Sequence, residues 1–112
     1  MNRELMREMM RRCGLGDEHL HPVARAYSRV LMVMPTAMFV RRPKDDALYV
    51  AVALYSYRKP WMTLDEISEI SRVGRKQIGR TYRVYRRQYE QRGQDPALGQ
   101  IRFDDGFKRQ WE

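Results

Sequence analysis

Apolar residues recur at spacings of three and four along most of the chain, which is the periodicity of helices that bury one face. No stretch alternates between apolar and polar residues in the way that a half-buried strand does. The pattern therefore predicts an all-α fold. Its five helices are expected over residues 2–13, 22–34, 44–58, 63–70 and 75–91.

The third of these helices is apolar on nearly every side. Between Ala47 and Tyr57, only Ser56 lacks a mainly apolar or aromatic character. A helix of this kind is buried on most of its sides, and its small residues, which include Ala51 and Ala53, let neighbouring helices approach closely. We therefore predict that the other helices surround this one.

The first helix carries a methionine-rich apolar face. Its members are Leu5, Met6, Met9, Met10 and Cys13. Because methionine fills irregular gaps in protein interiors, we interpret this face as core packing rather than as a binding groove. Gly14 and Gly16 follow the face and are expected to end the helix.

Residues 63–89 predict two helices joined by a short turn at residues 71–74. Thr63 and Glu66 have the spacing of a capping box, in which each side chain satisfies a backbone N–H at the start of a helix. Asp65 adds negative charge at the positive end of the helix dipole. The beginning of the fourth helix is therefore sharply defined by the sequence.

The same two helices have the spacing of a helix-turn-helix. Ile67, Val73 and Ile78 would form the core that the two helices share, and Ser68 is the small residue where they approach closely. In a helix-turn-helix the second helix presents its N-terminal half to DNA. The other interpretation of this spacing is an ordinary helical hairpin with a solvated basic face.

The fifth helix has two opposed stripes. The apolar stripe consists of Ile78, Tyr82, Tyr85 and Tyr89, and the basic stripe consists of Lys76, Arg80, Arg83 and Arg87. The two stripes are two residues out of step, which is about 200° of rotation around a helix. We expect the tyrosines to face the core and the cations to face solvent.

The positive charge of the chain is concentrated in this region. Between Arg72 and Arg92 there are eight Lys or Arg residues and one acid, Glu90, so this segment carries +7 of the formal net charge of +8. A solvated charged face usually mixes signs, whereas a surface that follows phosphates does not, because neutralising phosphates releases counterions. Arg supplies 18 of the 22 cations and suits bidentate phosphate contacts.

Catalysis is not expected. No nucleophile–base pair is visible, and no glycine-rich phosphate loop follows a strand. Tyrosines 55, 57, 82 and 85 are interpreted as core residues rather than as an active site. The acids Asp65, Glu66 and Glu69 are explained by their place near a helix start. The sequence implies no cofactor.

The cysteine and histidine content argues against a metal site. Cys13 is the single cysteine, so no disulfide can form within the chain, and with His19 and His21 it fits no standard metal site. One unpaired cysteine is typical of a reducing compartment, and the charged N-terminus is no signal peptide. We therefore expect a cytoplasmic or nuclear protein that is not secreted and has no membrane span.

The order of these helices and the residues within them resemble the cyclin-like repeat of transcription factor IIB and its archaeal counterpart, transcription factor B. The likeness to the first repeat of that family is strongest over residues 47–87, where TLDEI at 63–67 and IGRTYR at 78–83 match closely. Weaker likeness extends back to about Leu5. The resemblance implies a five-helix cyclin-like domain over residues 1–92, with a helix-turn-helix at residues 63–89.

The resemblance also implies a function and partners. The chain would be a non-enzymatic transcription initiation module that contacts promoter DNA, the TATA-binding protein and RNA polymerase. Carried over by position, the residues that face DNA would be Arg72, Arg75, Lys76, Arg80 and Arg83. With Arg87 of the basic stripe, they make six predicted nucleic-acid-binding residues. The alternative is a cyclin-like protein-interaction module that binds the transcription machinery without contacting DNA.

The sequence departs from the family at both ends. The paired cysteines of the N-terminal zinc ribbon and the linker that enters RNA polymerase are not present in this sequence, and most of the second repeat is missing. We expect a one-repeat version of the family: a minimal archaeal or viral relative, or a fragment of a longer protein. Residues 93–112 would be a tail or the start of a second repeat, and the aromatic Phe107 and Trp111 could support a homodimer.

Overall fold

The computed structural model describes residues 2–33, 43–57 and 62–92, without the side chains at 33, 43, 44 and 89–92. The all-α prediction is confirmed, because none of the described residues is in a strand. The helices are α1 (Arg3–Arg12), α2 (Leu20–Val33), α3 (Pro43–Tyr57), α4 (Leu64–Ser71) and α5 (Arg75–Arg92), and a 3-10 helix, η1 (Asp17–His19), precedes α2. None of these helices combines the length and the apolar character needed to cross a bilayer. The predicted tail at 93–112 lies outside the described residues.

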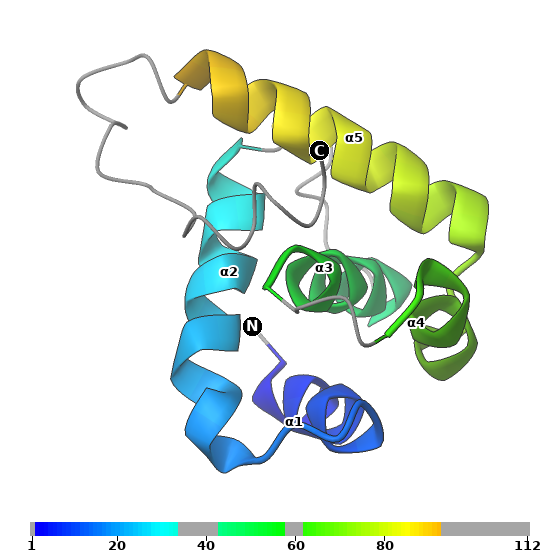
Figure 1. Ribbon diagram of the computed structural model, residues 1–112. Coiled ribbons are helices and arrows are strands. Elements are labelled where there is room, and N and C mark those ends of the chain that lie inside the picture. The colour runs from blue at the N-terminus through cyan, green and yellow to red at the C-terminus, as the bar shows by residue number, and fades with distance from the viewer. Residues whose placement is uncertain (1, 34–42, 58–61, 93–112) are drawn as a thin grey trace.

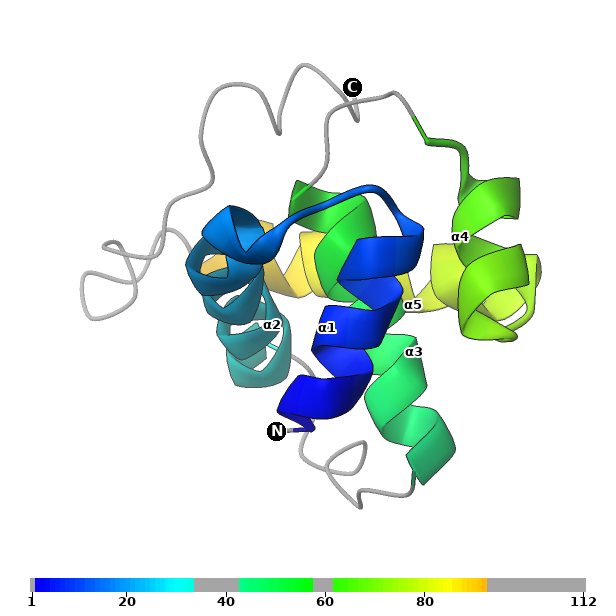
Figure 2. The ribbon, with the colours of Figure 1, turned by 90° about the horizontal axis from the view of Figure 1, so that it is seen from below.

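Helix α3 occupies the centre of the fold. The other four helices lie around it, with α1, α2, α4 and α5 on four different sides (Figures 1 and 2). Every residue from 48 to 54 is buried, including Ala51 and Ala53, which have no exposed surface. Buried Ser56 donates its hydroxyl to the carbonyl of Ala53 at 3.0 Å, so its polar group is satisfied within the helix. The prediction of a buried central helix is confirmed.

Helix α1 packs its methionine face against α3. Met6, Met9, Met10 and Cys13 are all buried, and Leu5 is half-buried at the edge of the same face. The interpretation of this face as core packing is therefore confirmed. The helix ends at Arg12, one residue before the predicted end, and Gly14 then adopts a φ of +78°, a left-handed conformation that glycine tolerates at no steric cost.

Several predicted helix boundaries were wrong by one or two residues. Helix α2 begins at Leu20 rather than at Pro22, because η1 leads directly into it. Pro22 is thus the third residue of α2, in the first turn, where its missing N–H leaves no hydrogen bond unmade. Helix α3 begins at Pro43, another first-turn proline, one residue before the predicted start. Its last described residue is Tyr57, and the predicted end at Arg58 lies outside the described residues.

The last turn of α3 emerges from the core. Tyr55 and Tyr57 were predicted to be buried, but both are half-buried. The Tyr57 hydroxyl lies 3.0 Å from Nδ1 of His19. A half-buried tyrosine usually packs its ring against the core while its hydroxyl bonds a partner near the surface. Tyr82 and Tyr85, by contrast, are buried as predicted.

Candidate nucleic-acid interface

The start of α4 is fixed by the predicted capping box. The Thr63 hydroxyl accepts a hydrogen bond from the backbone N–H of Glu66 at 3.1 Å. In return, Oε1 of Glu66 accepts a hydrogen bond from the backbone N–H of Thr63 at 3.2 Å. Two N–H groups that the helix itself leaves unpaired are thereby satisfied.

The turn between α4 and α5 is held by serine side chains. The Ser68 hydroxyl donates to the carbonyl of Val73 at 2.6 Å, and the Val73 N–H donates to the Ser71 hydroxyl at 3.2 Å. Ser68 therefore does more than leave space between the helices, which was the role predicted for it. Its hydrogen bond joins the end of the turn to α4 and so helps to set the direction of α5.

Arg72 is the residue at which the chain reverses direction. It is the C-cap of α4 and adopts φ 58° and ψ 23°, the left-handed region. Among the residues that the structure describes, it is the only non-glycine residue with a positive φ. An L-residue with a Cβ is strained by roughly 1–2 kcal/mol in this conformation. The place usually held by glycine after a helix is thus held here by an exposed cation.

Replacing Arg72 with glycine is expected to stabilise the protein by about 0.5–1 kcal/mol. The left-handed strain is relieved, and the greater freedom of glycine in the unfolded chain offsets part of the gain. Urea denaturation followed by circular dichroism measures the change. Arg72→Ala is the control, because alanine keeps the strain and should give no gain. Equal stability of the two variants would contradict the explanation.

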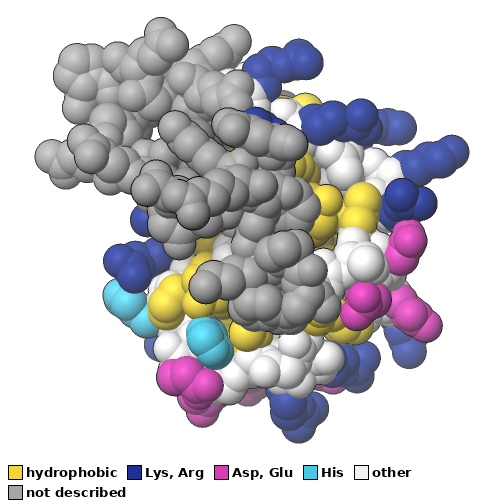
Figure 3. Space-filling view, viewed as in Figure 1, with side chains coloured by type: hydrophobic (Ala, Val, Ile, Leu, Met, Phe, Trp, Pro, Cys, Tyr) yellow, Lys and Arg dark blue, Asp and Glu magenta, His cyan; other side chains and the backbone are white. Residues whose placement is uncertain are grey.

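Helix α5 turns its two stripes in opposite directions, as predicted. The carbonyl of Gly74 accepts the first helical hydrogen bond, from the N–H of Ile78, at 3.0 Å. Ile78, Tyr82 and Tyr85 are buried with at most 6% of their surface exposed. The side chain of Tyr89 lies outside the described residues. The cations of the opposite stripe are all exposed: Lys76, Arg80, Arg83 and Arg87. Figure 3 shows dark-blue side chains projecting along α5 at the top and right of the molecule.

The six predicted interface residues differ in how firmly they are engaged within the chain. No hydrogen bond or ion pair joins the side chain of Arg72, Lys76, Arg80 or Arg87 to another described residue. Arg83 donates from Nε only to the carbonyl of Gly79 in its own helix, at 3.3 Å. A phosphate that binds any of these five side chains therefore displaces no strong contact with another described residue.

Arg75 is the exception among the six. Its Nε lies 3.2 Å from Oδ1 of Asp65, which joins the first turn of α5 to the first turn of α4. Both side chains are about two-thirds exposed, at 65% and 69%. An ion pair this exposed contributes at most about 1 kcal/mol, so a phosphate could displace Asp65 from Arg75. Nothing in the sequence indicated this pairing, because the two residues belong to different helices.

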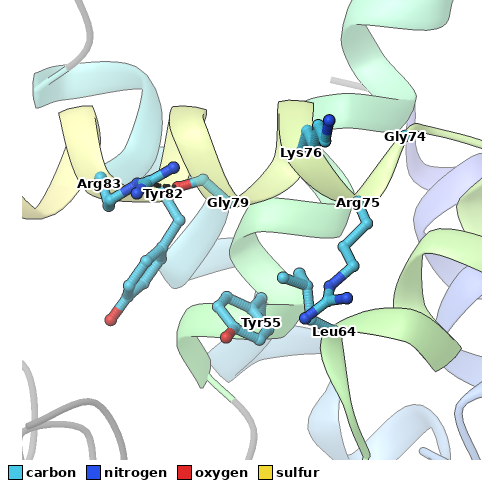
Figure 4. A pocket seen from close by; sticks show the side chains of 8 residues that line it. All are labelled: Tyr55, Leu64, Gly74, Arg75, Lys76, Gly79, Tyr82 and Arg83. Carbon is cyan, nitrogen blue, oxygen red and sulfur yellow. Dashed lines mark hydrogen bonds between the residues drawn. The ribbon is translucent and has the colours of Figure 1, made fainter.

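A shallow groove runs beside the basic stripe, between the start of α5 and the end of α3. Its volume is about 730 Å³, and it is lined by Tyr55, Leu64, Gly74, Arg75, Lys76, Gly79, Tyr82 and Arg83. Figure 4 shows the ring of Tyr55 between Tyr82 and the guanidinium of Arg75. The Tyr55 and Tyr82 rings meet edge to face, with centroids 5.0 Å apart and an interplanar angle of 85°. Burial raises the pKa of the Tyr55 phenol, and the charge of Arg75 lowers it in part.

Sequence reasoning did not connect Tyr55 with the basic stripe. Tyr55 comes from the central helix, some twenty residues before α5, and nothing in the spacing of α5 points to it. Its half-exposed position at the end of an otherwise buried helix is the only signal, and that signal is visible only in the folded chain. The candidate interface therefore includes an aromatic residue as well as the predicted cations.

In the part of the chain that the structure describes, no three His, Cys, Asp or Glu side chains are close enough together to hold a metal ion. Comparison with known proteins adds no further guide, because no protein-family model, curated protein or solved structure matches the chain. The function is therefore inferred from the geometry and chemistry of the described residues.

Proposed function

We propose that this chain is a non-enzymatic DNA-binding module whose contact surface is the exposed basic stripe of α5. The observation that supports this most strongly is the orientation of the stripe. Lys76, Arg80, Arg83 and Arg87 are all exposed, and three of them make no contact with a described acid or carbonyl. Four cations spaced along one face of a helix suit the regular negative charge of a nucleic-acid backbone.

In this proposal α4, the turn and α5 form a helix-turn-helix. The burial of Ile67 and Ile78, with Val73 half-buried against the same core, supports this proposal. Helix α4 carries exposed Asp65, Glu66 and Glu69, which would be repelled by DNA. The basic surface of α5, and not α4, would therefore enter a groove or lie along the phosphates.

The proposal extends to a place in transcription initiation. The resemblance at residues 63–67 and 78–83 falls on the capping box of α4 and on the centre of α5, which are the elements that build the proposed interface. Four helices packed around a buried fifth also suit a cyclin-like repeat. We accordingly propose that the chain joins a complex of promoter DNA with the TATA-binding protein and RNA polymerase, with phosphate contacts positioning it and supplying little sequence specificity.

Binding of this kind should depend steeply on salt. If the four stripe cations each neutralise one phosphate, the slope of log affinity against log salt is about −3.6, so affinity for a short duplex should fall about 100-fold between roughly 50 and 200 mM salt. Fluorescence anisotropy with a labelled duplex measures this slope. A chain that ignores DNA throughout this range would instead be a protein-interaction module.

The transcription partner is tested separately. Immobilised TATA-binding protein is offered the chain with and without a TATA-containing duplex, and the bound fraction is measured. Retention that requires the duplex supports the transcription proposal. DNA binding without any retention by the TATA-binding protein would leave a DNA-binding module outside initiation, and retention without DNA would favour the protein-interaction alternative.

A further inference from the structure

The groove beside the basic stripe has the chemistry of a nucleotide site. One wall is the half-buried ring of Tyr55, which is braced edge to face by buried Tyr82. Arg75 and Arg83 are exposed at its two ends, as Figure 4 shows. An aromatic face flanked by guanidinium groups is the combination that single-stranded nucleic-acid sites use, with the ring for the base and the cations for the backbone.

Two residues that line the groove are glycines and present no side chain to it. Gly74 and Gly79 both line it, and a Cβ added to Gly74 would meet no atom within 4 Å. A Cβ at Gly79 would meet only a methyl of Leu64, at 3.7 Å, which is an ordinary contact. Packing among the described residues therefore does not occupy this space. The groove is open to a flat group that approaches the backbone of α5.

The electrostatics of the groove favour an anionic ligand. Its described lining includes three cations and no acid, and Asp65 of α4 is paired with Arg75. A phenol is protonated at neutral pH, and burial raises the pKa of Tyr55 further, so the ring adds no negative charge. A planar base with a phosphate beside it satisfies all of these features.

We propose that this groove binds one unpaired nucleotide of a DNA strand that lies on α5, with the base stacked on Tyr55 and the adjoining phosphate near Arg75 or Arg83. Bases of a continuous duplex are stacked inside the helix and cannot reach the ring, so the site selects DNA that is locally open. This inference rests on the proposed DNA-binding function, since the basic stripe holds the strand. A nucleotide free in solution has the same chemistry and is the other source to distinguish.

The test compares two labelled duplexes that differ only by a single unpaired nucleotide at the centre. We expect the bulged duplex to bind about five-fold or more tightly than the continuous one, the increment of one stacked base. Tyr55→Leu should remove this preference, whereas Tyr55→Phe, which keeps the ring, should retain it. The preference is the ratio of the affinities for the two duplexes, measured on the same protein sample. A smaller fraction of folded protein lowers both apparent affinities together and leaves this ratio unchanged.

Tyr57→Leu is the matched control. Tyr57 lies on the same helix and is also half-buried, but its ring faces His19, outside the groove. It should keep the preference for bulged DNA. Equal affinity of the native chain for both duplexes, or a preference that survives Tyr55→Leu, overturns the inference and leaves the proposed function standing. Binding to neither duplex overturns both. Competition by deoxyadenosine monophosphate without any bulge preference overturns the assignment to a strand.

Discussion

Replacing both Arg80 and Arg83 with glutamate should weaken binding to a short duplex by about 100-fold or more. Each arginine is exposed on the basic stripe and would make a charge-assisted contact worth roughly 1.5 kcal/mol or more, which is about ten-fold in affinity. Reversing the charge adds repulsion to the lost contact. Anisotropy titration at low salt measures the loss, and the salt slope of any residual binding should fall by about 2.

The fold should survive this double substitution. Both side chains point away from the core, and Arg83 bonds only to a carbonyl of its own helix. The new carboxylates would lie one turn from Lys76 and Arg87, where opposite charges stabilise a helix by a few tenths of a kcal/mol. Circular dichroism and thermal unfolding should therefore match the native chain.

A matched pair on α1 shows whether the position of the charge matters. Arg3 and Arg7 are exposed, and α1 lies on the other side of α3 from α5 (Figures 1 and 2). Their replacement by glutamate makes the same change in net charge and should cost far less affinity. If the two double variants lose binding equally, attraction comes from the overall charge, and α5 is not a defined contact surface.

The sequence was most informative where the geometry of a single helix determines which side chains are buried and which are exposed. The opposed stripes of α5 follow from helical geometry alone, so the burial of Tyr85 and the exposure of Arg80 could be predicted without knowing what α5 packs against. The capping box at Thr63 is likewise local. The continuous apolar run of α3 could mean only burial on all sides, and the structure confirms it.

Prediction failed where two elements meet. The pairing of Arg75 with Asp65 and the place of Tyr55 beside α5 depend on how the helices pack, which periodicity does not determine. The bond from Ser68 to the Val73 carbonyl depends on the left-handed turn at Arg72, a position where sequence rules favour glycine. The exposed cations of α5 could therefore be predicted from one helix, whereas the groove beside them could not.

Tyr85→Ala is expected to lower the free energy of unfolding by about 3–5 kcal/mol, the cost of removing a buried aromatic ring and leaving a cavity. Tyr85 has no exposed surface and lies with Tyr82 on the face of α5 that packs toward α3, the ring centroids being 6.3 Å apart. Because small domains are stable by only about 5–15 kcal/mol, this variant should be close to unfolding. Urea denaturation measures the change.

The control lies two residues further along the same helix. Arg87→Ala removes an exposed side chain and should change stability by no more than about 0.5 kcal/mol, while weakening DNA binding. Tyr85→Ala should instead act mainly on stability. The arginines remain in this variant, but the contact that directs them outward is lost. DNA binding should therefore weaken only to the extent that the protein unfolds. A loss of stability below about 1 kcal/mol for Tyr85→Ala would mean that α5 is not anchored by its aromatic face, and the outward direction of the basic stripe would then have no structural cause.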